Sequence, residues 1–469
     1  MVSTSITNLN LFKGVAYRQR CGYDLRSGAE TTIKGFVLSQ ILEWLAFLSL
    51  ILMLWQWVVA RRFPLHQRVA VPWLALQPLA AERGLSTEAV APSATLGRTR
   101  AFPPNALPFG LAQPPDEGWS PQGHPVLADQ APPVTLLKPL KGCDPATEAC
   151  LRSWFVQQYP GRVQMLFAIT SSDDPVRPVL ERLLKEFADH DAQFMVCGPL
   201  SGTNAKVSKL AQLERLAKHD ILVISDADVL VPPDFLVNIV APLSEPQVGL
   251  VNCFYRQANP TTLAMQWEAV AINADFWSQV LQSQSLKPMD FALGAVMATR
   301  RGPLAAIGGF NALKDCLADD YQLGNRIARC GHRIVLSPVV VDCWAPRMDW
   351  AQVWQHQLRW ARTIRVCAPA PYFFSILSNA TLWPLLWLTA NPSRRGLVFG
   401  LGCVLLRAVT ALNLQSRLTQ ARARLKYAWL AGAKDLLQAA IWLGAFTGNR
   451  IQWRGQEMRL KRDGTLVKA

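Results

Sequence analysis

The chain has 469 residues, enough for one large catalytic domain with additional segments, and half of them are hydrophobic. The 17 tryptophans and the formal net charge of +15 fit either nucleic acid or an anionic membrane surface, and long apolar runs without a nucleic-acid-binding module favour the membrane. The ten cysteines include no CxxC pair and no zinc-type spacing, which argues against a zinc site or a disulfide framework and favours reduced cytosolic thiols.

The first long apolar run covers 41–60 and carries a single charge, Glu43. Twenty residues are about the length that spans a bilayer core. More than thirty residues precede the run and no small-residue cleavage site follows it, so we expect a signal anchor at 35–62 rather than a signal peptide. Arg61 and Arg62 favour a cytosolic location for the chain that follows, although basic residues before the run weaken this rule.

Proline dominates the next segment. Thirteen prolines lie between Pro64 and Pro133, with no lysine and no sustained apolar period. We therefore expect 63–132 to be a linker or a poorly ordered insertion, separate from the N-terminal segment 1–34.

From Val134 onward, short apolar runs alternate with helical periodicity. The expected buried strands are Val134–Leu137, Val163–Thr170, Phe194–Cys197, Ile221–Ser225 and Val248–Phe254. Apolar residues spaced by three and four indicate helices within 176–187 and 207–216. The alternation predicts an α/β domain at 133–347 with a mainly parallel sheet, whose ligands should lie at the carboxyl ends of its strands.

The chain becomes apolar again after Arg365. The run 366–393 carries no charge and 396–414 carries only Arg407, so both are candidates to span a membrane. A third run, 427–447, is compatible with spanning, re-entering or lying in the interface.

Lys434 and Asp435 interrupt that third run. We expect two or three transmembrane or interfacial helices within 366–449, followed by a basic tail at 450–469. The charge of the tail favours the cytosolic side, whereas three complete spans would place it outside.

Two carboxylates follow the expected strand Ile221–Ser225. Asp226 and Asp228 stand two residues apart on the turn that leaves the strand, where they can jointly hold one hard cation. Such a cation can bridge the oxygens of a diphosphate and neutralise a departing one. A polar turn is the alternative, because Asp is favoured in turns.

A second aspartate pair, Asp173 and Asp174, follows the strand Val163–Thr170 and precedes Pro175. This pattern also describes an ordinary helix start. Its place at a second strand end, matching that of Asp226, favours a role in the same site.

A third pair, Asp319 and Asp320, precedes a helical run at 321–330. A helix cap explains one of these residues, and an exposed carboxylate at a pocket edge can instead take a proton from an attacking hydroxyl. Gly294 and Gly308 lie upstream, where small residues let a sugar or a lipid head group approach the backbone; turns are the commoner reason for glycine.

The segment 348–365 has the pattern of an amphipathic helix. Arg359, Arg362 and Arg365 recur every three residues opposite an apolar side. The pattern suits a helix in the membrane interface, and Arg359 also suits a phosphate because its planar fork matches that charge. Both interpretations are compatible if the helix forms the floor of a site at the membrane.

In this order, the features resemble the ceramide glucosyltransferase family of lipid-directed GT-A glycosyltransferases, including its bacterial hopanoid-associated branch. The resemblance runs from about Val134 to the tail. Its residues are Leu137-Lys-Pro-Leu-Lys-Gly, Asp173-Asp-Pro, Asn204-Ala-Lys206, Asp226-Ala-Asp228, Asp319-Asp-Tyr321, Arg359-Trp360 and Trp453-Arg-Gly455. It implies an α/β, GT-A-type catalytic domain with one N-terminal and two or three C-terminal transmembrane or interfacial helices.

The resemblance also implies how a UDP-sugar donor is bound. Asp173 would help seat the uridine near Lys138 and Pro139. Lys206 would add a positive charge near the phosphates, and Asp226 would contact the donor.

For the chemical step, the resemblance implies that Asp226 and Asp228 hold Mg²⁺ or Mn²⁺ against the diphosphate. Asp320 would be the general base of an inverting displacement at the anomeric carbon. Arg359 would stabilise the departing nucleotide diphosphate, and Trp360 would shape the acceptor site. These roles agree with the general principle that metal and arginine stabilise charge on a leaving group.

One position departs from the family pattern. The motif around Arg359 usually begins with Gln or Arg three residues earlier, where this chain has His356; Gln355 lies one place too early, a shift of about 100° around a helix. The change leaves Arg359 in place but affects the expected acceptor contacts, which include His356 and Asp319. It favours the bacterial branch of the family.

The expected activity is therefore transfer of one sugar from a UDP-sugar to a membrane lipid hydroxyl, first of all glucose to ceramide. Transfer of an N-acetylhexosamine to a hopanoid or another polyol lipid is the alternative. A processive polysaccharide synthase would need a translocation channel, for which two or three spans are too few. A nonenzymatic basic membrane scaffold explains charge and tryptophan content but not the aspartate pairs.

The expected partners are the UDP-sugar, the lipid acceptor and the bilayer, without nucleic acid, and the oligomeric state stays open. We expect an integral protein of the bacterial inner membrane whose catalytic domain faces the cytosol.

Overall fold

The computed structural model describes residues 37–68, 131–453 and 456–468. The expected segment 1–34, most of the proline-rich linker and the motif residues Arg454 and Gly455 lie outside these ranges.

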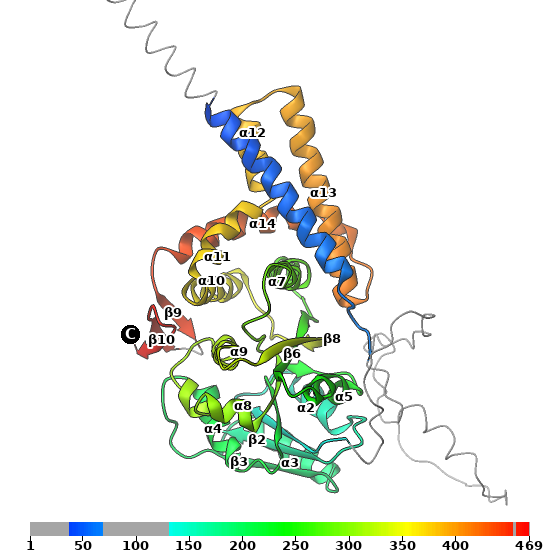
Figure 1. Ribbon diagram of the computed structural model, residues 1–469, viewed down its shortest axis with the longest axis vertical. Coiled ribbons are helices and arrows are strands. Elements are labelled where there is room, and N and C mark those ends of the chain that lie inside the picture. The colour runs from blue at the N-terminus through cyan, green and yellow to red at the C-terminus, as the bar shows by residue number, and fades with distance from the viewer. Residues whose placement is uncertain (1–36, 69–130, 454–455, 469) are drawn as a thin grey trace, which may run out of the picture. The chain divides into compact units, whose positions relative to one another are not determined.

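A mixed sheet forms the centre of the α/β domain (Figure 1). It has eight strands, in the order β3-β2-β1-β4-β7-β6-β8-β5. The strands are β1 Val134–Pro139, β2 Val163–Ile169, β3 Asp191–Val196, β4 Ile221–Ser225, β5 Val229–Leu230, β6 Val248–Gln257, β7 Val296–Arg300 and β8 Arg333–Cys343. β1 to β4 pair in parallel, as do β6 and β8, whereas β7 runs antiparallel between β4 and β6. The predicted α/β class is confirmed.

Helices and connecting segments cover both faces of this sheet. They are α2 Thr147–Phe155, α3 Arg177–Glu186, α4 Ala205–Glu214, α5 Phe235–Val240, α6 Leu263–Val270, α7 Trp277–Gln284, α8 Arg301–Ala306 and α9 Asp319–Arg329. The neighbours Leu136 and Leu137 of β1 belong to different hydrophobic clusters, as the two-residue period of a strand requires. A strand buried on both faces explains why the parallel strands are continuous apolar runs in the sequence.

A π-helical segment, η4 Ala271–Phe276, joins α6 to α7 without a break. The predicted amphipathic helix is α10, Trp350–Cys367, and it begins with a capping box between Asp349 and Gln352. Helices α6 and α10 pack against each other, and both contact α14, Leu430–Ala445.

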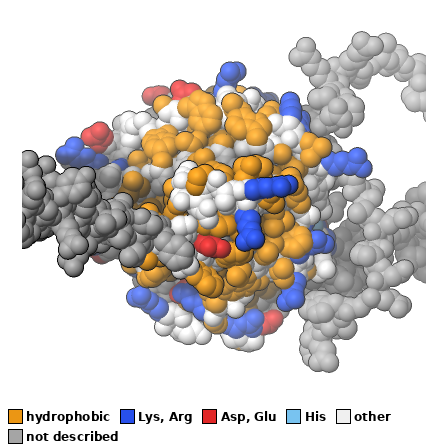
Figure 2. All heavy atoms as spheres, turned by 90° about the horizontal axis from the view of Figure 1, so that it is seen from above, with side chains coloured by type: hydrophobic (Ala, Val, Ile, Leu, Met, Phe, Trp, Pro, Cys, Tyr) orange, Lys and Arg blue, Asp and Glu red, His pale blue; other side chains and the backbone are white. Residues whose placement is uncertain are grey.

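Two helices in the described part of the chain are long and apolar enough to cross a membrane, Val37–Arg62 and α13, Arg394–Thr419. The uncharged run before α13 is not one helix, because Pro369–Ser378 and Leu382–Ala390 meet at an angle of 55°. Large apolar side chains on the two long helices face outward, and hydrophobic side chains dominate the view from above (Figure 2). Outward-facing apolar surface of this kind is what lipid tails cover.

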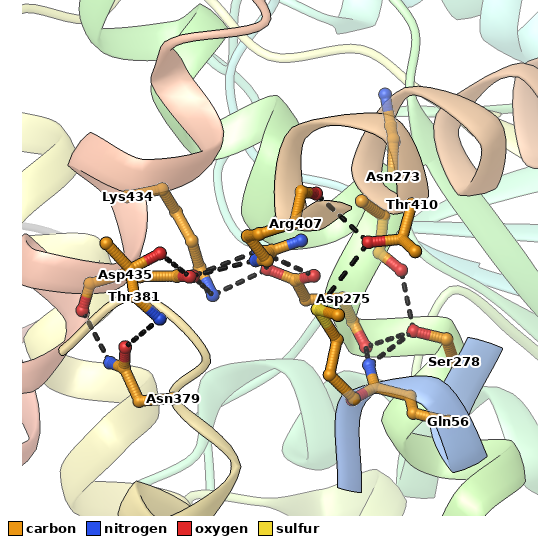
Figure 3. Close-up of polar contacts among 12 residues, drawn as sticks. Gln56, Asn273, Asp275, Ser278, Asn379, Thr381, Arg407, Thr410, Lys434 and Asp435 are labelled. Atoms are coloured by element: carbon orange, nitrogen blue, oxygen red, sulfur yellow. Dashed lines mark hydrogen bonds and ion pairs between the residues drawn. The ribbon is translucent and has the colours of Figure 1, made fainter. Parts of the chain in front are cut away.

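Buried charges join α13 to the rest of the protein (Figure 3). Arg407 lies 2.9 Å from Asp275 of η4 and 2.8 Å from Asp435 of α14, and Lys434 lies 2.5 Å from Asp275. All four side chains are less than a tenth exposed. Two cations face two carboxylates, so the charge of the cluster is balanced. The charges that interrupt the two C-terminal apolar runs, Arg407, Lys434 and Asp435, thus belong to one paired cluster.

Several polar contacts attach the N-terminal helix, Val37–Arg62, to the rest of the protein. Gln56 donates a hydrogen bond to the hydroxyl of Ser278 in α7, at 2.6 Å. Trp57 donates one to Asn413 in α13, at 3.0 Å. The N-terminal helix therefore packs on both the α/β domain and α13.

The C-terminal residues form a second, antiparallel sheet of three strands, where the sequence predicted only a basic tail. Its strands are β9 Arg450–Trp453, β10 Gln456–Leu460 and β11 Leu466–Lys468. The amide of Leu466 donates to the carbonyl of Asp315 at 2.7 Å, and that of Leu317 donates to Gly464 at 3.2 Å. Leu317 also shares a hydrophobic cluster with the sheet. The tail therefore packs against the segment that leads into α9 and stabilises its position.

Candidate active site

The loop after β4 carries Asp226 and Asp228, and the side chain of Lys138 contacts the backbone of this loop. This lysine is fully buried, and its ammonium group donates to the hydroxyl of Ser225 at 3.0 Å and to the carbonyl of Asp226 at 2.5 Å. It also lies 5.2 Å from the ring centroid of Trp154. Burial lowers the pKa of Lys138 to about 8. Lys138 therefore holds the loop in place through hydrogen bonds from the protein interior.

Lys206 joins the loop after β4 to the start of α9. Its ammonium group lies 2.7 Å from Asp226 and 3.1 Å from Asp319. Asn204 caps α4 and so sets the position of this lysine, accepting from the amides of Lys206 and Val207 at 3.0 and 3.2 Å. Burial alone would lower the pKa of Lys206, but the neighbouring aspartates outweigh it and hold the pKa above its ordinary value.

Asp320 lies beside this ion-pair cluster, in the first turn of α9. One carboxylate oxygen accepts from the amide of Tyr321 at 2.7 Å. The other faces Gly294, where an added Cβ would lie 2.6 Å from it. Burial, and next the charge of Asp319, raise the pKa of Asp320 to about 6. A carboxyl group with that pKa can accept a proton near neutral pH.

Asp228 has a similarly raised pKa. Its side chain reaches solvent, yet surrounding protein displaces much of the water near the carboxylate. This burial, followed by the charge of Asp226, raises the pKa of Asp228 to about 6. A cation placed between two carboxylates would relieve the repulsion between them.

The donor set fits a divalent ion held jointly with a substrate. Among the residues that the structure describes, no group of three or more His, Cys, Asp or Glu is arranged around one metal position. Asp226 and Asp228 offer two carboxylates, and Mg²⁺ is often held by one or two carboxylates together with phosphates and water.

The strand ends β1, β2 and β4 lie at one edge of the sheet, because these strands are parallel neighbours. Pro139 ends β1 and is buried, whereas Asp173 follows β2 and is exposed. Asp174 instead accepts from the amides of Gly142 and Val176, at 3.0 and 3.1 Å. The cap-like role expected for this aspartate pair thus falls to Asp174, and the side chain of Asp173 stays open to solvent.

The expected acceptor residues occupy different surroundings. Asp319 is buried against Lys206. Nδ1 of His356 lies 2.7 Å from a carboxylate oxygen of Glu268, and the ring centroid of His356 lies 4.6 Å from that of Trp360. Arg359 is half-buried on the same helix, and its carbonyl accepts from the hydroxyl of Thr363 at 2.8 Å.

Two features near the candidate site, Glu268 and the three-stranded tail, were not identified from the sequence. Glu268 is the single charged residue of the apolar helix α6, and that isolation was the available signal. The three-stranded tail contacts Arg362 and Arg365 of α10 through Arg450 and Asn449. These two arginines are thus held by protein rather than lying free in water, as an interfacial helix alone would place them.

The sequence is similar to that of known proteins. The family model of glycosyl transferase family 21 matches residues 117–466. Ceramide glucosyltransferase of Candida albicans is 34% identical over 122 residues, covering 24% of this chain and 22% of that protein. Ceramide glucosyltransferase 3 of Caenorhabditis elegans is 24% identical over 218 residues, covering 46% and 47%. The chain thus matches between a fifth and a half of the length of these curated relatives.

Among solved structures, a mannosyltransferase from Pyrobaculum calidifontis in complex with GDP-Man and Mn²⁺ is similar to this chain. It is 22% identical, with a TM-score of 0.43, covering 67% of this chain and 88% of that one. The structure of TarS from S. aureus in complex with UDP-GlcNAc is 9% identical, with a TM-score of 0.36, covering 72% and 99%.

Proposed function

The chain belongs to glycosyl transferase family 21, and from this premise we propose that it transfers a sugar from a UDP-sugar to a lipid hydroxyl at a membrane, with glucose and ceramide as the first substrates to test. The observation that carries the proposal is the position of Lys206, whose ammonium group lies between Asp226 and Asp319. Asp319 immediately precedes Asp320, the candidate base. One buried cation thus joins a candidate metal loop to a candidate base.

Each part of the site has a role in the proposed transfer. Asp320 accepts the proton of the lipid hydroxyl, whose oxygen attacks the anomeric carbon opposite the nucleotide and inverts its configuration. Asp226 and Asp228 hold Mg²⁺ or Mn²⁺, which when bound neutralises charge on the diphosphate. Arg359 stabilises the departing nucleotide, and Trp360 borders the acceptor.

The donor side follows the edge of the sheet. Asp173, exposed at the end of β2, contacts the uridine, while Pro139 shapes the adjoining end of β1. Lys206 adds positive charge near the phosphates. Lys138 contributes indirectly, because its two hydrogen bonds hold the chain at Ser225 and Asp226.

Exposed apolar side chains support a lipid acceptor. Trp354 and Ile364 of α10 are 37% and 45% exposed, and Phe373 and Phe374 just beyond it are more than half exposed. The helices that carry them, α10 and Pro369–Phe374, lie between the α/β domain and the apolar helices (Figure 1). A lipid there can present a hydroxyl while its tails stay in the bilayer. A nonenzymatic scaffold needs this surface but not the cluster around Lys206.

The proposal is tested with the purified full-length protein in lipid nanodiscs. UDP-glucose or UDP-N-acetylglucosamine is supplied with ceramide or a total bacterial lipid extract, and products are identified by mass spectrometry. We expect a glycosylated lipid only with a divalent ion present. No lipid product from any of these combinations would contradict the proposal.

Asp226→Ala tests the metal loop separately from transfer. We expect calorimetry to show that Mg²⁺ or Mn²⁺ strengthens UDP-sugar binding to the wild type but not to this variant. Asp290→Ala is the matched control, because Asp290 forms an exposed pair with Lys287. Equal metal-dependent affinity in wild type and Asp226→Ala would remove the loop from the proposed mechanism.

A further inference from the structure

Glu268 is a buried carboxylate of α6 that contacts two consecutive residues of α10. Its side chain is 1% exposed, and one of its oxygens lies 2.7 Å from Nδ1 of His356 and 2.9 Å from Nε2 of Gln357. An unpartnered carboxylate at this depth would be costly, so these two contacts are what make its burial tolerable.

The two contacts determine how α10 is rotated about its own axis. Consecutive side chains leave a helix about 100° apart, yet those of His356 and Gln357 converge on a single oxygen of Glu268. Only a narrow range of helix rotation satisfies both contacts. The side chains farther along α10, including Arg359 and Trp360, follow that rotation.

Glu268 also determines which nitrogen of His356 carries a proton. A carboxylate accepts hydrogen bonds, so Nδ1 must be the donor in this contact. Within the described part of the chain, Nε2 has no hydrogen-bond partner, and the side chain keeps 27% of its exposure. In the neutral ring this nitrogen is an acceptor, suited to a hydroxyl group.

The ring of Trp360 lies between His356 and the helix that carries Glu268. Its centroid is 4.6 Å from that of His356 and 6.3 Å from that of Phe276 in η4. The neighbour of Phe276 is Asp275, which pairs with Arg407 (Figure 3). The continuous helix α6-η4-α7 thus contacts Trp360 through Phe276, holds the neighbouring His356 through Glu268, and pairs with α13 through Asp275.

We propose that Glu268 is a positioning residue for the acceptor: by fixing His356 and the rotation of α10, it sets Trp360 and the open Nε2 for a hydroxyl-bearing lipid head group. The inference rests on the proposed lipid glycosyltransferase function. It also gives a role to His356, the position where the chain departs from the family pattern, because its imidazole and the buried carboxylate of Glu268 form a hydrogen-bonded pair. The donor-binding loop after β4 lies outside this pair.

The experiment compares Glu268→Ala with Glu268→Gln in nanodiscs, using ceramide and UDP-glucose as probes. We expect Glu268→Ala to raise KM for ceramide roughly tenfold, equivalent to about 1.4 kcal/mol, while the calorimetric affinity for UDP-glucose changes less than about twofold. Glu268→Gln keeps an acceptor oxygen at the same reach and should restore most of the loss. Glu245→Ala, which removes an exposed carboxylate paired with Arg333, is the control.

A double-mutant cycle separates positioning from general stability. Because Glu268 acts through His356, the effects of Glu268→Ala and His356→Ala on KM for ceramide should be strongly non-additive. If Glu268→Ala does not fold, His356→Phe removes the Nδ1 donor, keeps a ring beside Trp360 and must show the same acceptor-selective loss. Additive effects, or equal losses for donor and acceptor, overturn the inference.

The two proposals fail in different ways. If the wild type transfers no sugar to any lipid, the proposed function is wrong whatever the variants do. If the wild type transfers sugar and the Glu268 variants have the same KM for ceramide as Glu245→Ala, only the proposed positioning role of Glu268 is wrong.

Discussion

The ammonium group of Lys206 lies 2.7 Å from a carboxylate oxygen of Asp226. The same group reaches Asp319 at 3.1 Å, so a single side chain of α4 connects the loop after β4 with α9. The residues proposed to hold the donor and the residue proposed to take the proton therefore cannot move independently.

Replacing this lysine should change the pH dependence of the enzyme. Lys206 lowers the pKa of Asp320, so in Lys206→Met the carboxyl holds its proton to higher pH. We expect the acidic limb of the rate profile to move upward and turnover at pH 6 to fall roughly tenfold. Lys206→Arg keeps the charge and is the control. An unmoved acidic limb in Lys206→Met would separate Lys206 from the base.

The wild type should lose activity as pH falls through about 6. Burial and Asp319 raise the pKa of Asp320 to about 6, and only its ionised form accepts a proton. Below that pH we expect kcat/KM to fall about tenfold per unit. A profile that stays flat down to pH 4.5 would assign the proton to another group.

Asp320→Asn should abolish transfer while leaving UDP-sugar affinity intact. A raised carboxyl pKa means that the ionised form costs stability above pH 6, so Asn at this position should leave the melting temperature equal or higher there. Calorimetry, turnover and thermal unfolding at pH 7.5 check the three expectations. Near-normal turnover in this variant would remove Asp320 as the base.

Gly294→Ala should impair turnover without unfolding the protein. An added Cβ would lie 2.6 Å from an oxygen of Asp320 and 3.1 Å from its Cγ, so the carboxylate must move. We expect kcat to fall roughly tenfold or more with little change in donor affinity. Gly302→Ala is the control, because no atom lies within 4 Å of a Cβ added there. Equal turnover of the two variants would show that Asp320 tolerates displacement.

Much of the sheet followed from the sequence, because buried parallel strands are short, continuous apolar runs. β4 has the bounds that its apolar run predicted, and β1 and β2 differ by one or two residues. β8 was harder to recognise, since it contains Pro338 and proline is rare inside strands. The register between β6 and β8 shifts opposite this position, which accommodates it.

The candidate site was predicted in part. The aspartates at strand and helix boundaries could be found because polar residues after apolar runs mark the edge of a sheet. Contacts between distant segments could not. The burial of Lys138 under Asp226, and the meeting of Glu268 with His356, depend on packing that no local pattern records.

The charge cluster around Arg407 should make a large contribution to stability. Arg407→Leu leaves the buried carboxylates of Asp275 and Asp435 with one paired cation among the described residues, Lys434, and breaking a buried pair typically costs about 3–5 kcal/mol. We expect a clearly lower melting temperature in detergent. Lys287→Ala breaks an exposed ion pair and should change the free energy of unfolding by less than about 1 kcal/mol. Similar melting temperatures for the two variants would contradict this role.

The hydrogen bond between Leu466 and Asp315 determines the parity of membrane crossings. Because the tail pairs with the chain that enters α9, both occupy the same compartment, and in a bilayer the intervening chain must cross an even number of times. Between α10 and the tail, α13 alone has the length to cross. If α13 crosses a bilayer, the bent pair Pro369–Ser378 and Leu382–Ala390 would supply the return span, and the 16 residues of α14 would stay on the side of the sheet.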